Sequence, residues 1–386
     1  MGTEQAMLPM WRSVCQQPCT IRGRFLGCLL GGAVGDALGA PVEFMSREEI
    51  IIRFGPKGIT RYASAYGGLG TITDDTQMTL FTAEGLLRGY VRLASRGICN
   101  VTSVVAGAYL RWLQTQQERP GDQFDDIDGI YSGWLFQQAL LHERRAPGNT
   151  CLSALHALKT IKSRVIPAKN NSKGCGGVMR MAPLGLMAWS AKGYNVQRIF
   201  DMGIELAALT HGHPTGQLAS GVFPVLILAL VDGASLREGL ITAKALLKQK
   251  AQYEETLCAI EAAEKLADSL LPPHEAIAKL GQGWIAEEAL AISIYCALVG
   301  RSFREGVLLA VNHDGDSDST GSITGNLLGA AHGVKAIPNA WLDSLELREV
   351  ITEIAEDLYD YREWDIGEYS KNWEQKERVW QKYPGV

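Results

Sequence analysis

Two short acidic patches, far apart in the chain, hold the residues best suited to chemistry. The first contains Thr73, Asp74 and Asp75, and the second is the sequence DGDSDS at residues 314–319. Carboxylate and hydroxyl oxygens are the ligands that Mg²⁺, Ca²⁺ and Mn²⁺ prefer, and neither patch contains the thiolates that softer metals favour. Adjacent carboxylates also repel one another unless a cation or strong hydrogen bonds offset their charge. Together, the two patches predict two divalent metal ions.

Two other roles compete with this interpretation. Asp314, Asp316 and Asp318 have the spacing that opens an EF-hand calcium loop. The sixth position is Ser319 instead of glycine, however, and the twelfth is Gly325 instead of glutamate, which excludes that loop. Asp and Ser also cap helix N-termini, and each patch runs directly into a helix-like segment. Helix capping therefore stays open as an alternative for either patch taken alone.

A glycine-rich segment at residues 172–177, SKGCGG, is a candidate anion-binding loop. Several glycines allow backbone amides to converge on a phosphate. The segment matches neither GxxxxGK[ST] nor GxGxxG, so it supports neither a nucleoside triphosphatase nor a dinucleotide-dependent oxidoreductase. A simple glycine-rich turn is the alternative.

Other polar residues could act beside these segments. His211 and His213 form an i,i+2 pair without a third nitrogen or sulfur ligand, which makes a poor zinc site, so one of them binding a ligand or a capping role is more plausible. Pro41 should end a glycine-rich helix and leave Glu43 in a loop. Asp36 lies inside that apolar helix and needs a partner if it is buried.

Helices must position these groups. Apolar residues recur at offsets of three, four, seven and eight between residues 26 and 38, which indicates one buried helical face, and the glycines there indicate close packing. Similar patterns cover residues 76–93, 104–113, 201–209, 218–231, 253–270, 285–299 and 322–331, and a peripheral helical layer is expected at 342–383. Strand-like runs are scarce, with 58–62 the best candidate. The sequence predicts an all-α fold.

Composition limits the class of protein. The 386 residues are 46% hydrophobic and 20% charged, as in ordinary globular proteins. A net charge of −5 without a basic block argues against a nucleic-acid partner. The longest strongly apolar stretch, residues 222–231, is about half a membrane span, and the first twenty residues lack a signal-peptide pattern. We expect a cytoplasmic protein without a membrane partner.

No repeat, low-complexity tract or linker divides the chain, so we expect one domain over residues 21–386. The two acidic patches must then meet in space. Residues 1–20 stand apart: they are apolar around Trp11 and form either a frayed terminus or an arm that docks on a surface.

Taken in order, six of these motifs resemble the ADP-ribosylglycohydrolase superfamily, which includes the dinitrogenase reductase-activating glycohydrolase. They are GGAVGDALG at 31–39, TDDT at 73–76, GCGGVMR at 174–180, THGH at 210–213, GWIAEEA at 283–289 and GDSDS at 315–319. The resemblance runs from about residue 22 to about residue 334. Ser317 and Ser319 stand where the family usually has threonines.

The resemblance implies an orthogonal all-α bundle with two Mg²⁺ or Mn²⁺ ions. Carried over by position, the metal ligands would be Thr73, Asp74, Asp75, Asp316, Asp318 and Ser319. The diphosphate would be held by Ser172, Lys173, Gly174, Cys175 and Gly176. His211 would contact the distal ribose or the diphosphate. The candidate catalytic residues are Asp75, Asp316 and Glu43.

The implied reaction is hydrolysis of an N-glycosidic bond that releases ADP-ribose from a modified protein side chain, with arginine the preferred linkage. A hydrolase of this kind can also protect a cell from an ADP-ribosyltransferase toxin, by reversing the modification or by binding the toxin through residues 1–20. A non-catalytic protein that binds ADP-ribose or a toxin is the alternative.

Overall fold

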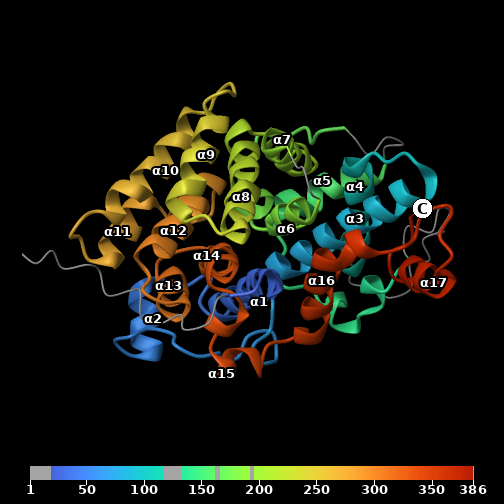
Figure 1. Ribbon diagram of the computed structural model, residues 1–386. Helices are drawn as coiled ribbons and strands as arrows, with labels where there is room; N and C mark the ends of the chain where they lie inside the picture. Colours follow the sequence, from blue (N-terminus) through green and yellow to red (C-terminus); the bar gives the residue numbers. More distant parts are fainter. Residues whose placement is uncertain (1–18, 117–131, 161–165, 192–194, 386) are drawn as a thin grey trace, which may run out of the picture.

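A computed structural model of the protein describes residues 19–116, 132–160, 166–191 and 195–385. The helices are α1 (Ile21–Gly39), α2 (Arg47–Phe54), α3 (Asp74–Arg96), α4 (Val101–Thr115), α5 (Asn149–Lys159), α6 (Ala182–Ser190), α7 (Val196–Ala207), α8 (Pro214–Asp232), α9 (Leu236–Leu247), α10 (Glu254–Ala267), α11 (Pro273–Leu280), α12 (Ala286–Val299), α13 (Phe303–Ala310), α14 (Ser317–His332), α15 (Asn339–Leu342), α16 (Arg348–Asp360) and α17 (Trp373–Lys382). They run in several directions around a common core (Figure 1). The all-α prediction is confirmed, and every segment predicted as helical overlaps one of these helices.

The best strand candidate, residues 58–62, does not form a strand, and the described residues contain no β-strand. The backbone of Ile59 is satisfied by a side chain instead of a neighbouring strand. Its N–H donates to Oδ1 of Asn312 at 2.7 Å, and its carbonyl accepts from Nδ2 of the same residue at 3.0 Å. Such a long-range contact leaves no pattern in the local sequence.

Helices α1 and α14 lie side by side and antiparallel near the centre of the bundle (Figure 1). Glycines four residues apart on each helix let the two backbones touch. A Cβ atom added to Gly35 would lie 1.9 Å from the carbonyl oxygen of Gly321, and one added to Gly325 would lie 2.0 Å from that of Gly31. Only glycine permits this approach. It fixes the C-terminal end of α1 against the N-terminal end of α14.

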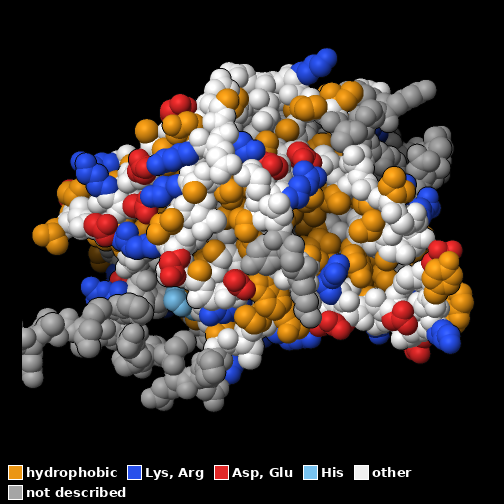
Figure 2. Space-filling model, turned by 45° about the horizontal axis from the view of Figure 1, so that its top comes forward, with side chains coloured by type: hydrophobic (Ala, Val, Ile, Leu, Met, Phe, Trp, Pro, Cys, Tyr) orange, Lys and Arg blue, Asp and Glu red, His pale blue; other side chains and the backbone are white. Residues whose placement is uncertain are grey.

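Helix α8 is apolar on all sides and lies in the core. By length and composition it could cross a membrane, but 83% of that stretch is buried inside the protein. A helix that is hydrophobic all round is expected in the interior of a large domain. On the face shown in Figure 2, basic and acidic side chains are interspersed, and neither sign forms a broad patch.

Helices lie near both ends of the described chain. Thr20 caps α1 by accepting a hydrogen bond from the N–H of Gly23. The predicted N-terminal arm falls on residues 1–20, of which 1–18 lie outside the described residues. Helices α15, α16 and α17 form the expected C-terminal layer, with α17 at one edge (Figure 1).

Candidate active site

Asp36 fixes the first acidic patch to helix α1. Its buried carboxylate accepts hydrogen bonds from the N–H of Thr73 at 3.0 Å, the N–H of Thr76 at 3.1 Å and the hydroxyl of Thr76 at 2.5 Å. The two N–H donors belong to the amides at the start of α3, which have no partner within the helix. The partner that a buried Asp36 requires is therefore the first turn of another helix.

The first patch contains a helix cap and two further carboxylates. Thr73 is the N-cap of α3, because its hydroxyl accepts from the N–H of Asp75 at 3.4 Å. Asp74 accepts a hydrogen bond from the N–H of Gly148 at 3.4 Å. Oδ1 of Asp75 is buried without any hydrogen-bond partner. Capping thus accounts for Thr73 but not for the two aspartates.

The second patch has the same organisation at the start of α14. Asp316 is the N-cap and accepts from the N–H of Ser319 at 3.3 Å, while Asp318 accepts from the same N–H at 3.0 Å. The thiol of Cys175 donates to Asp316 at 2.9 Å. Asp314 is exposed and accepts instead from the N–H of Arg47. It therefore lies apart from the other aspartates.

The structure brings the two patches together, as one compact domain requires. A Cβ atom on Gly39 of α1 would lie 2.4 Å from the Cα of Asp318, and Asp36 of the same helix binds the N–H of Thr73. Burial and the charge of Asp318 raise the pKa of Asp74 and the pKa of Asp75 well above their usual range. Such mutual effects require the carboxylates to lie close together in a medium of low polarity.

Glu43 joins this group from the turn that follows α1. Helix α1 ends at Gly39, just before Pro41, as predicted. The Glu43 side chain is not solvated, as a loop glutamate usually is: the residue is 6% exposed, and Oε2 has no hydrogen-bond partner. Burial, followed by the charges of Asp318 and Asp316, raises the pKa of Glu43 far above its ordinary value. The sequence predicts the turn, but it carries no sign of the burial.

We call six buried carboxylates the acidic cluster: Asp36, Glu43, Asp74, Asp75, Asp316 and Asp318. Within the part of the chain that the structure describes, none of them forms an ion pair with a lysine or arginine. Burying so much unpaired negative charge is costly unless the carboxylates take up protons or bind cations.

Hard divalent cations fit this donor set, which is rich in oxygen. Among the described residues, no three Asp, Glu, His or Cys side chains converge closely enough to hold a metal ion by themselves. Coordination would therefore need the hydroxyls of Thr73 and Ser319, or inward movement of the carboxylates, in addition to the cluster as it stands. The hydroxyl of Ser319 lies 3.5 Å from the sulfur of Cys175, at the edge of the cluster.

The glycine-rich loop runs beside the acidic cluster. The N–H of Cys175 donates to the carbonyl of Trp284 at 3.1 Å, and the carbonyl of Lys173 accepts from the N–H of Ala286 at 2.8 Å, so the loop is attached to the start of α12. The hydroxyl of Ser172 lies 3.0 Å from that of Thr150. The ammonium group of Lys173 is already paired with two carboxylates, those of Glu255 and Glu287.

His211 is buried against this loop and presents a donor to it. The guanidinium of Arg180 donates to the hydroxyl of Thr210 at 2.7 Å, and that hydroxyl lies 2.9 Å from Nδ1 of His211. Arg180 can only donate, and the threonine proton has two acceptors, Nδ1 of His211 and the carbonyl of Ala207 at 3.4 Å. The shorter contact favours Nδ1 as the acceptor, which leaves the imidazole proton on Nε2. A Cβ atom on Gly174 would lie 3.4 Å from Nε2.

Burial and the charge of Arg180 lower the pKa of His211 to about 3, so the ring is neutral at pH 7. Arg180 is fully buried over the ring of Tyr109, and its hydrogen bonds go to neutral acceptors. Its positive charge therefore lies behind the loop, and no carboxylate of the described residues forms an ion pair with it. The sequence places Arg180 within one of the six motifs but indicates no role for it. His213 is a cap, since its side chain accepts from the N–H of Thr215 at the start of α8.

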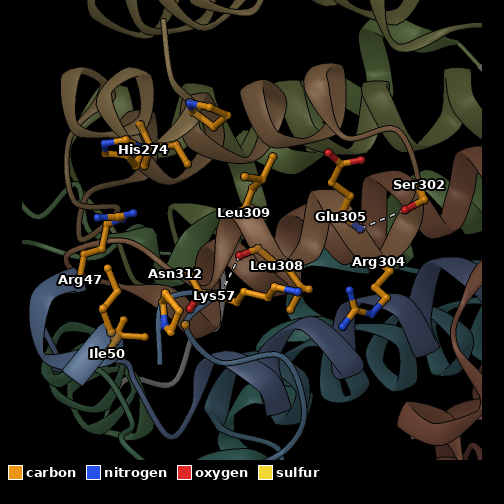
Figure 3. Close-up of a pocket in the computed structure, with 15 residues that line it drawn as sticks. Arg47, Ile50, Lys57, His274, Ser302, Arg304, Glu305, Leu308, Leu309 and Asn312 are labelled. Carbon is orange, nitrogen blue, oxygen red and sulfur yellow. Dashed lines mark hydrogen bonds between the residues drawn. The ribbon is translucent and has the colours of Figure 1, made fainter. Parts of the chain in front are cut away.

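A separate pocket of about 540 Å³ lies between α2, α11 and α13 (Figure 3). Arg47, Lys57, His274 and Arg304 line it together with apolar side chains. It contains none of the predicted site residues. The acidic cluster and the glycine-rich loop are thus the only places where the predicted residues gather within the described chain.

Comparisons with known proteins identify the family. The family model described as ADP-ribosylglycohydrolase matches residues 18–367. The chain is 26% identical over 333 residues to the ADP-ribosyl-[dinitrogen reductase] glycohydrolase of Rhodospirillum rubrum, covering 85% of this chain and 92% of that protein. It is 24% identical over 373 residues to the ADP-ribosylarginine hydrolase Tri1 of Serratia proteamaculans, covering 93% and 86% respectively.

The fold agrees with a solved structure as well. A chain of an ADP-ribosylglycohydrolase-related protein complex matches with a TM-score of 0.64 at 27% identity, covering 88% of this chain and 98% of that one. This confirms the bundle that the resemblance implied. With a family model matching nearly its whole length, the chain belongs to the ADP-ribosylglycohydrolase family of hydrolases.

Proposed function

We propose that this protein is a metal-dependent hydrolase that removes ADP-ribose from modified arginine side chains of proteins. One observation carries the proposal: six buried carboxylates without a basic partner lie beside a glycine-rich loop that a neutral histidine and a buried arginine support. The carboxylates suit cations and the hydroxyl groups of a ribose. The loop suits a diphosphate, so the two parts together match the two ends of an ADP-ribosyl group.

The residues that would hold two Mg²⁺ or Mn²⁺ ions are Thr73, Asp74, Asp75, Asp316, Asp318 and Ser319. When bound, such ions would orient the ribose hydroxyls and withdraw charge from the reacting sugar. Asp36 keeps Thr73 in place through the hydrogen bond between its carboxylate and the Thr73 N–H. The stripe of glycines between α1 and α14 holds Asp318 at the same point.

The diphosphate would rest against the loop formed by Ser172, Lys173, Gly174, Cys175 and Gly176. A Cβ atom on Gly176 would lie 2.9 Å from the sulfur of Cys151 and 3.2 Å from the His211 ring, so this position leaves room only for glycine. Nε2–H of His211 can donate to a phosphate or ribose oxygen. The unpaired charge of Arg180 favours an anion on this side of the site.

Glu43 is the best candidate for the general acid. Burial is the largest cause of its raised pKa, and burial favours the protonated carboxyl group whether or not cations occupy the cluster. Glu43 would give its proton to the departing guanidine nitrogen as the bond from that nitrogen to the anomeric carbon breaks. A water oxygen would add to the same carbon while Asp75 or Asp316 takes up the proton that the water loses.

Relatives support the arginine linkage, since one similar protein is named an ADP-ribosylarginine hydrolase. The direct test is a panel of peptides that carry ADP-ribose on arginine or on serine, assayed with Mg²⁺ or Mn²⁺. We expect the wild type to release ADP-ribose fastest from arginine, and Asp75→Ala to lower that rate at least 100-fold. Tight binding of ADP-ribose by the wild type without release from any peptide would favour a non-catalytic binding protein instead.

A further inference from the structure

Two large, solvent-exposed aromatic side chains stack on each other at the edge of the acidic cluster. The rings of Phe44 and Trp284 are 5.7 Å apart and inclined by only 17°. Phe44 is 73% exposed and Trp284 is 38% exposed. A single exposed aromatic residue needs no explanation, but two that stack in water and leave ring surface uncovered suggest a place where a ligand binds.

The pair connects two sides of the acidic cluster. Phe44 directly follows Glu43 in the turn after α1. Trp284 follows Gly283, where a Cβ atom would lie 3.3 Å from the Cβ of Asp316. The carbonyl of Trp284 holds the N–H of Cys175 in the glycine-rich loop. The stacked pair therefore joins the turn that carries the candidate general acid to the loop that packs against Asp316.

A third aromatic residue lies near the same carboxylates. Tyr66 is 44% exposed and has a φ of +48°, a left-handed conformation that is strained for a tyrosine. Burial of its hydroxyl, followed by the charge of Glu43 and then that of Asp318, raises the pKa of Tyr66. Three loops thus bring aromatic side chains to the edge of one negatively charged site.

The ligand group that suits this edge is flat and positively charged. A guanidinium stacks on aromatic faces and is attracted by their π electrons. A neutral ring such as adenine also stacks on aromatic faces, so the position of the pair beside Glu43 must distinguish the two groups. If Glu43 protonates the group bonded to the anomeric carbon, that group must lie next to Glu43. Phe44 directly follows Glu43 in the chain and is therefore close to that group.

We infer that Phe44 and Trp284 form a stacking face for the guanidinium of the ADP-ribosylated arginine and give the enzyme its preference for that linkage. This inference rests on the proposed function. Because both rings are partly exposed, replacing them leaves the core intact. The substitutions therefore test recognition of the substrate instead of folding.

The experiment compares Phe44→Ala, Trp284→Ala and the conservative Trp284→Phe. We expect the alanine variants to raise the KM for an ADP-ribosyl-arginine peptide about tenfold, equal to about 1.4 kcal/mol, with kcat within threefold of the wild type. Trp284→Phe should stay within threefold in KM. The affinity for free ADP-ribose, measured by calorimetry, should change less than twofold. Trp373→Ala, at an exposed tryptophan in α17, is the matched control.

Two results would overturn the inference: an unchanged KM in both alanine variants, or an equal loss of affinity for free ADP-ribose, which would place the rings on the ADP-ribose itself. Failure of the proposed function looks different, because the wild type would then leave the peptide intact. In that case calorimetry with the uncleaved peptide still decides the matter. The wild type should bind it more tightly than ADP-ribose, and Trp284→Ala should remove the difference.

Discussion

At the scale of single residues, the site depends on groups whose ionisation burial has changed. Glu43 and His211 illustrate opposite cases: burial favours the neutral acid of one and the neutral base of the other. Glu43 is suited to give a proton to the substrate, whereas the neutral ring of His211 is suited to donate a hydrogen bond. The sequence singles out both residues, but nothing within a few positions of either residue indicates burial, and their roles come from the family resemblance.

His211 gives a prediction about stability and pH. Its pKa is about 3 in the folded protein, below the value of about 6.5 in an unfolded chain. The unfolded state therefore binds more protons between these values, so this contribution is complete above pH 6.5 and is lost as the pH falls toward 3. From pH 7 to pH 5 the wild type should lose about 2 kcal/mol through this residue.

Urea unfolding at both pH values measures this loss. His211→Asn cannot take up a proton, so the drop in its unfolding free energy should be smaller than that of the wild type by about that amount. His274→Asn, at an exposed histidine, should behave like the wild type. Equal drops in the wild type and His211→Asn would show that His211 is not held in its neutral form.

At the scale of helices, backbone contact between α1 and α14 positions both acidic patches. The antiparallel arrangement places Asp36, near the end of α1, beside Asp318, at the start of α14. Asp36 then binds the first turn of α3, so three helix ends meet at one point. The site exists because glycines remove the side chains that would otherwise separate these helices.

Gly325→Ala tests this contact. The added methyl group would lie 2.0 Å from the carbonyl oxygen of Gly31, which is backbone and cannot rotate away. We expect a loss of about 2–3 kcal/mol in the free energy of unfolding, measured with urea, together with lower activity. Gly367→Ala meets no atom within 4 Å and is the control. A Gly325→Ala variant as stable as the wild type would contradict the close contact.

The same elements show what the sequence could and could not predict. The helical periodicity at residues 26–38 correctly predicted α1. Both acidic patches lie where helices begin, as the sequence also indicated, because both signals are local. Residues 58–62, the best strand candidate, form no strand. The side chain of Asn312, far away in the chain, binds the backbone of Ile59 instead. For the same reason, the stacking of Phe44 on Trp284 and the role of Arg180 emerged only from the folded chain.

At the scale of the whole molecule, charge is distributed unevenly between interior and surface. Basic and acidic side chains mix on the face in Figure 2, while six carboxylates are buried at one point. The net charge of −5 gives no hint of this concentration. Because these buried carboxylates repel one another, divalent cations should raise the free energy of unfolding strongly. A cation that binds only the folded state stabilises it.

The most direct test of the account is the rate at which the purified protein releases ADP-ribose from an ADP-ribosyl-arginine protein, before and after removal of divalent metals. We predict release with Mg²⁺ or Mn²⁺, a loss of at least 100-fold after chelation, and recovery when either ion is restored. Release that persists undiminished after chelation would contradict the metal-dependent mechanism. An intact substrate with either ion present would contradict the proposed function itself.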